Sequence, residues 1–207
     1  IIPKPITKKI HEVADHQIYG YTRWNHHDFK SSITTYFKRR FDTDMEEDWI
    51  LYSPSVMYSV SLLIRLLSQP HDKVLTMNPM YDAFINVIKE NDRELLSHHL
   101  IKEEGTFKID FDVFEKQAQE SALLLLCSPH NPTGRIWSDE EMHRMIEICK
   151  KYQVKIISDE IHMDIRIKDA KHHPLMKYYD EYKEIFTASS SSKTLNTPGL
   201  IGSYVII

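Results

Sequence analysis

One lysine, Lys193, comes directly after a run of small residues, 189–192, which itself follows the apolar segment 184–188. Small neighbours let other groups approach an amine closely, and a partly desolvated lysine has a lowered pKa, which suits Schiff-base chemistry with an aldehyde. Most lysines in proteins are solvated, so a surface loop lysine is the ordinary interpretation of this pattern. The residues upstream of Lys193 decide between the two.

Three further residues with useful chemistry each follow an apolar, strand-like segment. They are the carboxylate Asp159, the amide Asn131 in a loop made rigid by two prolines and a glycine, and Ser55. Ser55 opens a helix whose free N–H groups would hold a phosphate, although an ordinary helix cap explains the same pattern. In open α/β sheets, ligands bind at the carboxyl ends of the strands, so we expect these residues to share one site.

These residue types match the needs of one cofactor, pyridoxal 5'-phosphate. Its aldehyde needs an amine, its ring nitrogen needs a carboxylate and its phosphate needs an anion site. Lys193, Asp159 and the helix that begins after Ser55 supply one candidate for each need. The sequence therefore predicts a site for pyridoxal 5'-phosphate.

The elements that would position these residues alternate between strands and helices. Apolar runs indicate the strands, and helical spacing or a capping residue indicates each helix; Ser138 and Glu141, for example, form a capping box. Strands are predicted at residues 49–52, 73–77, 95–100, 122–127, 154–158, 184–188 and 203–207, and helices at residues 5–16, 31–41, 56–67, 81–90, 110–119 and 138–152. This alternation predicts an α/β fold with a mainly parallel sheet and helices on both faces.

Composition narrows the class of protein. The 207 residues, of which 42% are hydrophobic and 27% charged, are enough for one sizeable core but few for two ordinary domains. The net charge of -4, with interspersed signs, argues against a nucleic-acid surface. No apolar run reaches the roughly 20 residues that a membrane helix needs. We therefore expect one soluble domain that binds neither nucleic acid nor membrane.

The cysteines and histidines suggest neither disulfides nor metal. Cys127 and Cys149 are the only cysteines, and both lie in apolar segments, so we expect inert core thiols in a reducing compartment, the cytoplasm. Histidine pairs occur at 26–27, 98–99 and 172–173. Adjacent side chains on a strand or helix point apart, so these pairs do not form a metal site.

Three motifs carry a resemblance to a known family. They are SPHNPTG at 128–134, SDEIH at 158–162 and SKTLN at 192–196. Together they resemble fold-type I pyridoxal-phosphate enzymes of the class I/II aminotransferase superfamily, and they look like its MalY/PatB-like cystathionine β-lyase branch. The likeness runs in register from about residue 2 to residue 207. It implies a three-layer, aminotransferase-like large domain.

The resemblance implies roles for the residues that surround the cofactor ring. Lys193 matches the Schiff-base lysine, and Asp159 matches the carboxylate that pairs with the pyridine nitrogen. Asn131 matches an amide that hydrogen-bonds the phenolic oxygen of the cofactor. His162 occupies the place where many relatives have a tyrosine that contacts the same oxygen. Tyr81 matches the aromatic residue that stacks on the ring.

The family's phosphate contacts fall on a second group of residues. Val56 and Met57, which follow the cap Ser55, would donate backbone N–H groups. Ser190 and Ser192 would donate hydroxyl groups, and the sequence leaves open which of the two touches the phosphate.

One further residue suggests a homodimer. Tyr19 and Tyr21 lie in the segment 19–22, which in this family reaches the phosphate of the neighbouring subunit, and Tyr21 is the favoured candidate. The resemblance therefore implies that each site is completed by a second copy of the chain.

The resemblance also bears on the reaction. Aminotransferase relatives place a phosphate-binding arginine eight positions after the lysine, where this chain has Ile201, and the lyase branch lacks that arginine too. We therefore expect a carbon–sulfur β-lyase that acts on cystathionine or cysteine-type amino acids and gives a thiol, pyruvate and ammonia. An aminotransferase with the same site, a non-catalytic cofactor-binding module and an inactive fragment are the alternatives.

Family members carry residues before the position of Ile1 and a small domain after that of Ile207. The resemblance therefore implies that residues 1–207 are the large, pyridoxal-phosphate-binding domain alone. The family's arginine for the substrate carboxylate belongs to the small domain, so the exact substrate is left open.

Overall fold

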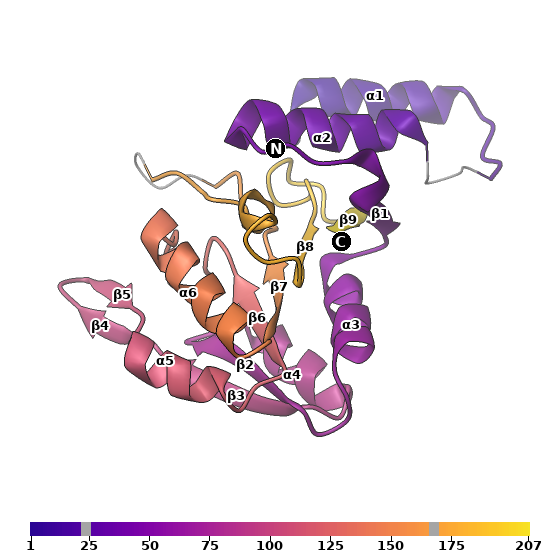
Figure 1. Cartoon of the computed structure of the whole chain (residues 1–207). Coiled ribbons are helices and arrows are strands. Elements are labelled where there is room, and N and C mark those ends of the chain that lie inside the picture. Colours follow the sequence, from indigo (N-terminus) through magenta and orange to yellow (C-terminus); the bar gives the residue numbers. More distant parts are fainter. Residues whose placement is uncertain (22–25, 166–169) are drawn as a thin grey trace.

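The computed structural model describes residues 1–21, 26–165 and 170–207, and its central feature is one mixed β-sheet (Figure 1). In the described residues this sheet has seven strands in the order β1-β9-β8-β7-β6-β2-β3. The strands are β1 Ile50–Ser53, β2 Lys73–Asn78, β3 Glu94–His99, β6 Leu123–Cys127, β7 Lys155–Asp159, β8 Ile185–Ser189 and β9 Ser203–Ile206. Strands β2, β3, β6, β7 and β8 run parallel, whereas β9 is antiparallel to both β8 and β1. The prediction of a mainly parallel sheet is confirmed.

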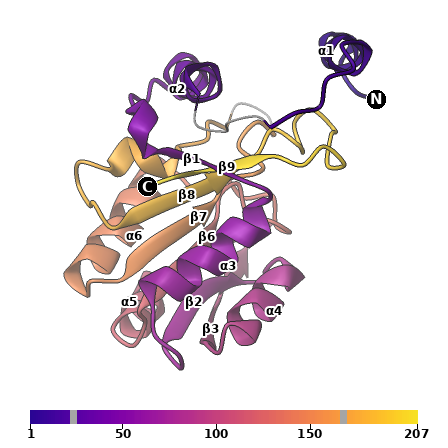
Figure 2. The same ribbon diagram turned by 90° about the vertical axis from the view of Figure 1, so that its right-hand side faces the viewer.

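Helices cover both faces of the sheet, as predicted (Figure 2). On one face lie α3 (Val56–Leu67) and α4 (Asp82–Glu90), and on the other lie α5 (Phe111–Ala118) and α6 (Asp139–Lys151). The helix α2 (His27–Phe41) packs on the α6 side near β9, where Phe37 meets Tyr204 edge to face. The remaining described helices are α1 (Lys4–Asp15), η1 (Glu47–Trp49) and η2 (Leu175–Tyr178).

Strand β6 shows how one run of sequence serves both layers. All of its residues are buried. Leu123 and Leu125 belong to the core under α3 and α4, whereas Leu124 and Leu126 belong to the core under α6. Successive side chains of a strand point to opposite faces, so a strand covered on both faces must be apolar throughout. The uninterrupted sequence LLLLC meets that need.

Local capping signals fix two helix starts where the sequence predicted them. The Glu141 N–H donates to Ser138 Oγ at 3.1 Å and the Ser138 N–H donates to Glu141 Oε2 at 2.8 Å, which completes the capping box of α6. The Asp110 carboxylate caps α5 by accepting the N–H groups of Asp112 and Val113, each at 3.1 Å. A cap involves residues within a single turn, so sequence alone can reveal it.

The predicted start of α2 at Ser31 is wrong, because the helix begins at His27. The ring of His26 caps it by accepting the Phe29 N–H at its Nδ1 atom, at 3.3 Å. Asp28 in the first turn adds a favourable interaction with the helix dipole. The start was missed because the sequence rules for caps favour serine over histidine.

The sequence analysis also missed a short hairpin between β3 and α5. Its strands are β4 (Ile101–Glu103) and β5 (Thr106–Lys108). Glu104 and Gly105 form the two-residue turn, both with positive φ, as the right-handed twist of a hairpin favours. The strands are short and largely exposed, so no apolar alternation revealed them.

Candidate active site

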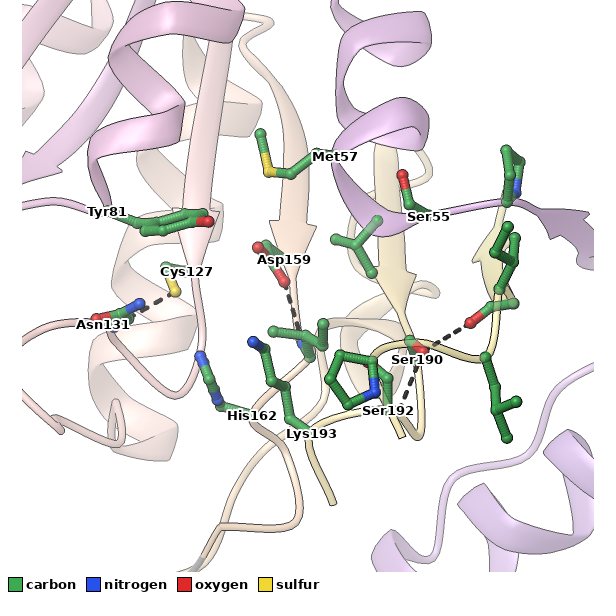
Figure 3. Close-up of a pocket in the computed structure, with 17 residues that line it drawn as sticks. Ser55, Met57, Tyr81, Cys127, Asn131, Asp159, His162, Ser190, Ser192 and Lys193 are labelled. Carbon is green, nitrogen blue, oxygen red and sulfur yellow. Dashed lines mark hydrogen bonds between the residues drawn. The ribbon is translucent and has the colours of Figure 1, made fainter. Parts of the chain in front are cut away.

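A cavity of about 390 Å³ opens at the carboxyl ends of the central strands (Figure 3). Every residue of the predicted site except Tyr21 lines it. These residues are Ser55, Val56, Met57, Tyr81, Asn131, Asp159, His162, Ser190, Ser192 and Lys193. The volume is typical of a small-molecule site. The fold therefore gathers residues from distant parts of the sequence around one space.

The register of the sheet explains why three of these segments meet. Cys127 at the end of β6 pairs with Asp159 at the end of β7, and Asp159 pairs with Ala188 on β8. The loops that carry Asn131 and Lys193 follow β6 and β8 directly. Because parallel strands end at the same edge of a sheet, the amide, the carboxylate and the amine lie close together.

The start of α3 forms an anion site at the same edge. Ser55 is its N-cap, and its Oγ atom accepts the Tyr58 N–H at 3.2 Å. The first N–H groups of a helix have no partner within the helix, so those of Val56 and Met57 are available to a ligand. The positive end of the helix dipole reinforces this preference for an anion.

The two candidate serines after β8 differ in what their hydroxyl groups do. Ser190 Oγ donates to the carbonyl oxygen of Gly202 at 2.7 Å and accepts the Ser192 N–H at 3.2 Å. The Ser192 hydroxyl makes no hydrogen bond within the described part of the chain. Ser192 can therefore donate to a ligand without first breaking an existing bond, whereas Ser190 cannot.

Asp159 is a buried carboxylate that faces the cavity (Figure 3). Burial raises its pKa to about 6, and this is opposed by the Ile161 N–H, which donates to Oδ1 at 3.1 Å. That bond is the one side-chain hydrogen bond recorded for Asp159 among the described residues. A buried carboxylate with so few partners has a strong electrostatic preference for a positively charged ligand group.

Lys193 extends from the loop after β8 into the cavity near Asp159 and His162 (Figure 3). Its side chain is exposed, so the partial desolvation suggested by its small neighbours is wrong for this structure. The physical reason is that the cavity is open on this side, where Leu200 and Ile201 are themselves exposed. The amine is thus accessible to an incoming aldehyde.

Asn131, His162 and Tyr81 complete the wall opposite the start of α3 (Figure 3). His162 is partly buried, and burial lowers its pKa, as does the nearby Lys193 ammonium group. Tyr81 is the N-cap residue of α4 and packs edge to face on Phe84, with ring centroids 5.9 Å apart. This packing holds a flat aromatic surface against the cavity.

Cys127 is a cavity residue whose position the sequence did not reveal. Its Sγ atom donates to the Pro129 carbonyl at 3.3 Å and accepts the Asn131 N–H at 3.4 Å. Burial raises the pKa of its thiol far above the ordinary range, so it stays protonated. Cys127 is therefore inert, as expected, but it also helps to hold Asn131 in place. Its position as the last residue of a strand was the available signal.

Tyr21 does not line the cavity, and its side chain is fully exposed. Tyr21 is the last described residue of the predicted segment 19–22, because Thr22 lies outside the described residues. Its predicted role towards a second subunit stays a prediction.

Neither a metal centre nor a membrane-spanning helix is found in residues 1–21, 26–165 and 170–207. No group of three or more His, Cys, Asp and Glu side chains there is arranged to hold a metal ion. No helix there is both long and apolar enough to cross a membrane.

The groups that surround the cavity fit pyridoxal 5'-phosphate. An accessible amine, a buried carboxylate and free N–H groups at a helix start face one space, as an aldehyde, a protonated ring nitrogen and a phosphate require. The model of the family "Aminotransferase class I and II" matches residues 2–207. The chain belongs to this family. The predicted resemblance is confirmed.

Two curated members of the family match almost the whole chain. Cystathionine beta-lyase PatB of Bacillus subtilis is 33% identical over 99% of this chain and 54% of its own length. Protein MalY of Escherichia coli is 34% identical over 98% of this chain and 52% of its own length. The chain therefore spans about half the length of these curated relatives.

Solved structures of the family agree with the fold. The pyridoxal-phosphate-bound C-S lyase of Staphylococcus hominis superposes with a TM-score of 0.96 at 31% identity, over 100% of this chain and 53% of its own. Cystalysin of Treponema denticola, which contains pyridoxal 5'-phosphate, gives a TM-score of 0.95 at 29% identity, with the same coverage of 100% and 53%. The predicted aminotransferase-like α/β architecture is confirmed.

Proposed function

We propose that the protein is a pyridoxal-phosphate-dependent carbon–sulfur β-lyase for cystathionine or cysteine-type amino acids. The observation that carries the proposal is the convergence of the Lys193 amine, the buried Asp159 carboxylate and the free start of α3 in one cavity. The relatives named cystathionine beta-lyase and C-S lyase support the choice of reaction.

The phosphate of the cofactor would bind at the start of α3. The N–H groups of Val56 and Met57 are its donors, and Ser55 holds that turn in place through its bond to Tyr58. We assign the hydroxyl donor to Ser192 rather than Ser190, because Ser190 already donates to Gly202.

The ring of the cofactor would lie between the remaining residues of the cavity. Asp159, which faces the cavity, would accept a hydrogen bond from its nitrogen, and the ring of Tyr81 would pack against its face. Asn131 and His162 would form hydrogen bonds with its phenolic oxygen. Burial and the nearby Lys193 ammonium group lower the pKa of His162, which favours the neutral imidazole, and a neutral imidazole can accept at one ring nitrogen while it donates from the other.

When bound, the cofactor supplies an aldehyde that captures the substrate amino group and a ring that accepts electrons from the α carbon. Lys193 anchors the aldehyde before substrate arrives, and its released amine then removes the α proton as a general base. Asp159, ionised above its pKa of about 6, holds a proton at the ring nitrogen. Thiol departure from the β carbon and hydrolysis of the remaining three-carbon unit give pyruvate and ammonia.

Ile201 favours a lyase over an aminotransferase. It lines the cavity with an apolar side chain where a guanidinium would otherwise add a second charge for the phosphate. An aminotransferase would need a keto acid to complete its cycle, whereas a lyase would not. The two reactions therefore differ in a way that a simple assay detects.

The first experiment tests cofactor attachment. The protein is mixed with pyridoxal 5'-phosphate, reduced with borohydride and digested, and the peptide that contains Lys193 is weighed by mass spectrometry. We expect the cofactor mass on Lys193 and none on the Lys193→Ala variant. Attachment spread over several surface lysines would contradict the proposed site.

The second experiment tests the reaction. The cofactor-loaded protein is incubated with cystathionine without any keto acid, and pyruvate is measured. We expect pyruvate. Amino-group transfer that appears only after a keto acid is added would establish the aminotransferase instead. Attachment at Lys193 with neither activity would indicate a cofactor-binding module.

We further propose that the protein is a homodimer in which Tyr21 reaches the site of the neighbouring subunit. Two observations support this: Tyr21 is fully exposed, and α1 has no buried residue although it carries apolar side chains such as Val13. In a mixed dimer of the Tyr21→Phe and Lys193→Ala variants, one site would combine Lys193 of the first chain with Tyr21 of the second and would be complete. The other site would lack both residues. We expect the mixture to regain about a quarter of the cofactor sites. No recovery in a mixture of proven dimers would contradict the role of Tyr21.

We also propose that residues 1–207 serve as the cofactor-binding large domain of such an enzyme, and that it works in the cytoplasm. The three-layer fold and the match to about half of each curated relative support the first statement. The buried, unpaired state of Cys127 and Cys149 suits a reducing compartment. Fractionation of the source cells, followed by detection of the protein, tests the location.

A further inference from the structure

The carboxylate of Asp164 joins three separate elements next to the candidate active site. Asp164 lies in the turn after β7, and its side chain is only 15% exposed. Its Oδ1 atom accepts the hydroxyl hydrogen of Tyr36 from α2, and Arg40 Nε of the same helix is 3.9 Å away. Its Oδ2 atom accepts the hydroxyl hydrogen of Thr194 at 2.6 Å. Thr194 is the residue directly after Lys193.

The loop that carries Lys193 has few other attachments. Its backbone closes on itself through the Leu195 N–H to the Ser191 carbonyl at 2.9 Å and the Thr197 N–H to the Ser192 carbonyl at 2.8 Å. Among the described residues, the Thr194 hydroxyl makes the only side-chain hydrogen bond from residues 191–196 to another element. The backbone position of Lys193 relative to β7 therefore depends strongly on this bond.

We propose that Asp164 is a positioning residue that fixes Lys193 in the cavity through Thr194. Tyr36 and Arg40 of α2 hold the Asp164 carboxylate, and the carboxylate holds the loop. This inference rests on the proposed function of Lys193 and adds to it the device that sets the lysine's position. An amine at the end of a flexible four-carbon side chain reaches a fixed aldehyde reliably only when its backbone is fixed.

The chemistry of the contact suits this role. A hydrogen bond from a hydroxyl to a carboxylate is short and stronger than one between neutral groups, and 2.6 Å is typical of such a bond. The Asp164 side chain is only 15% exposed, and its contacts with α2 keep the carboxylate in place to accept this bond. The side chain of Thr194 is exposed apart from this contact, so removing its hydroxyl has little effect on the core.

The test compares three loop variants. Thr194→Val removes the hydroxyl and keeps the shape, Thr194→Ser keeps the hydroxyl, and Ser191→Ala is the matched control. The Ser191 side chain makes no hydrogen bond within the described residues. Each variant is measured in two ways: amide hydrogen exchange of residues 192–197 without cofactor, and equilibrium binding of pyridoxal 5'-phosphate.

We expect Thr194→Val to speed exchange of the Leu195 and Thr197 amides about tenfold and to weaken cofactor binding about tenfold. Thr194→Ser and Ser191→Ala should match the parent protein in both measurements. Asp164→Asn should reproduce the loss, because an amide is a weaker acceptor than a carboxylate. If the Asp164→Asn variant does not fold, the two measurements on Thr194→Val decide whether the proposal stands.

Unchanged exchange of the loop amides in Thr194→Val would overturn the proposal. So would faster exchange combined with unchanged cofactor binding, because the loop would then be anchored without positioning Lys193. Failure of the proposed function is a separate result. It would appear as absence of cofactor binding in the parent protein, and the exchange data would still report whether Asp164 holds the loop.

Discussion

Two adjacent carboxylates at the end of β7 lie in opposite surroundings. Asp159 faces the cavity and, within the described part of the chain, accepts one hydrogen bond, from the Ile161 N–H. Glu160 is completely buried on the other side, where it accepts Ser158 Oγ at 3.1 Å and the Leu175 N–H at 2.7 Å, and pairs with His172 Nε2 at 3.1 Å. We call the side of β7 that Asp159 faces the cavity side, and the side on which Glu160 meets its partners the support side.

The two carboxylates illustrate the difference between residues that can bind a ligand and residues that stabilise the fold. A buried polar group with all its partners inside the protein stabilises one structure and has no capacity left for a ligand. A buried polar group with few partners carries an energetic cost that a ligand can relieve. On the cavity side, Asp159 is of this second kind, and the partly exposed Ser192 hydroxyl and the first N–H groups of α3 also lack partners among the described residues. Substitutions on the two sides should therefore change different properties.

The largest effect is expected for Lys193→Ala on the cavity side. It removes both the attachment point of the cofactor and the general base, so pyruvate formation from cystathionine should fall at least about a thousandfold. The melting temperature of the cofactor-free protein should not change, because the side chain is exposed. Lys116→Ala, an exposed lysine on α5, is the control and should keep full activity. Residual activity above a tenth of the parent value would contradict the role of Lys193.

Glu160→Ala on the support side should mainly lower stability. It leaves the Leu175 N–H, the Ser158 hydroxyl and His172 without their buried acceptor, which should reduce the free energy of unfolding by about 3 to 5 kcal/mol. Urea denaturation measures the change. The exposed Glu147→Ala on α6 should stay within about 0.5 kcal/mol of the parent. If Glu160→Ala lowers the free energy of unfolding by less than about 1 kcal/mol, the proposed difference between the cavity side and the support side is contradicted.

Asp159→Asn should stabilise the cofactor-free protein while weakening cofactor binding. Burial raises the pKa of Asp159 from 3.8 to about 6, so this carboxyl lowers the stability progressively as the pH rises from 3.8 to about 6, and the full cost remains above that pH. At about 1.4 kcal/mol per pKa unit, the variant should gain up to about 3 kcal/mol at pH 8. The gain should vanish near pH 4, where the parent carboxyl is already protonated. Urea denaturation across this pH range measures it, and equal stability at pH 8 would argue against the raised pKa.

The smallest effect is expected for Ser55→Ala, which tests a residue with a structural task on the cavity side. Loss of the cap to Tyr58 should lower the free energy of unfolding by about 1 kcal/mol, and Ser55→Gly should lower it less. Cofactor affinity should change little, because the N–H groups of Val56 and Met57 belong to the backbone. A large loss of affinity with unchanged stability would instead make the Ser55 hydroxyl itself a ligand contact.

Much of the fold was predictable because its signals are local. The buried strand β6 is a continuous apolar run, and α5 and α6 begin at caps formed within one turn. The exceptions are also local, but they lack a distinctive pattern. The His26 cap of α2 uses an uncommon residue, and the β4–β5 hairpin has short, exposed strands.

The candidate site was predictable as a set of residues but not as an arrangement. Motifs identified the amine, the carboxylate and the amide, and the structure places all three in one cavity. The sequence could not reveal that Ser190 donates to Gly202 or that Cys127 holds Asn131. Each of these depends on which segments become neighbours.

The sequence by itself determined most of the strands and helices and which residues stand at the ends of the central strands, because side-chain periodicity and caps act over a few residues. Only the tertiary structure decided that the ends of β6, β7 and β8 lie side by side, whereas β3 ends at the sheet edge. It also decided that Asp159 faces the cavity whereas Glu160, next to it in sequence, meets buried partners such as His172 and the Leu175 N–H. Burial and hydrogen-bond satisfaction are properties of the packed chain, and they give the two carboxylates different tasks.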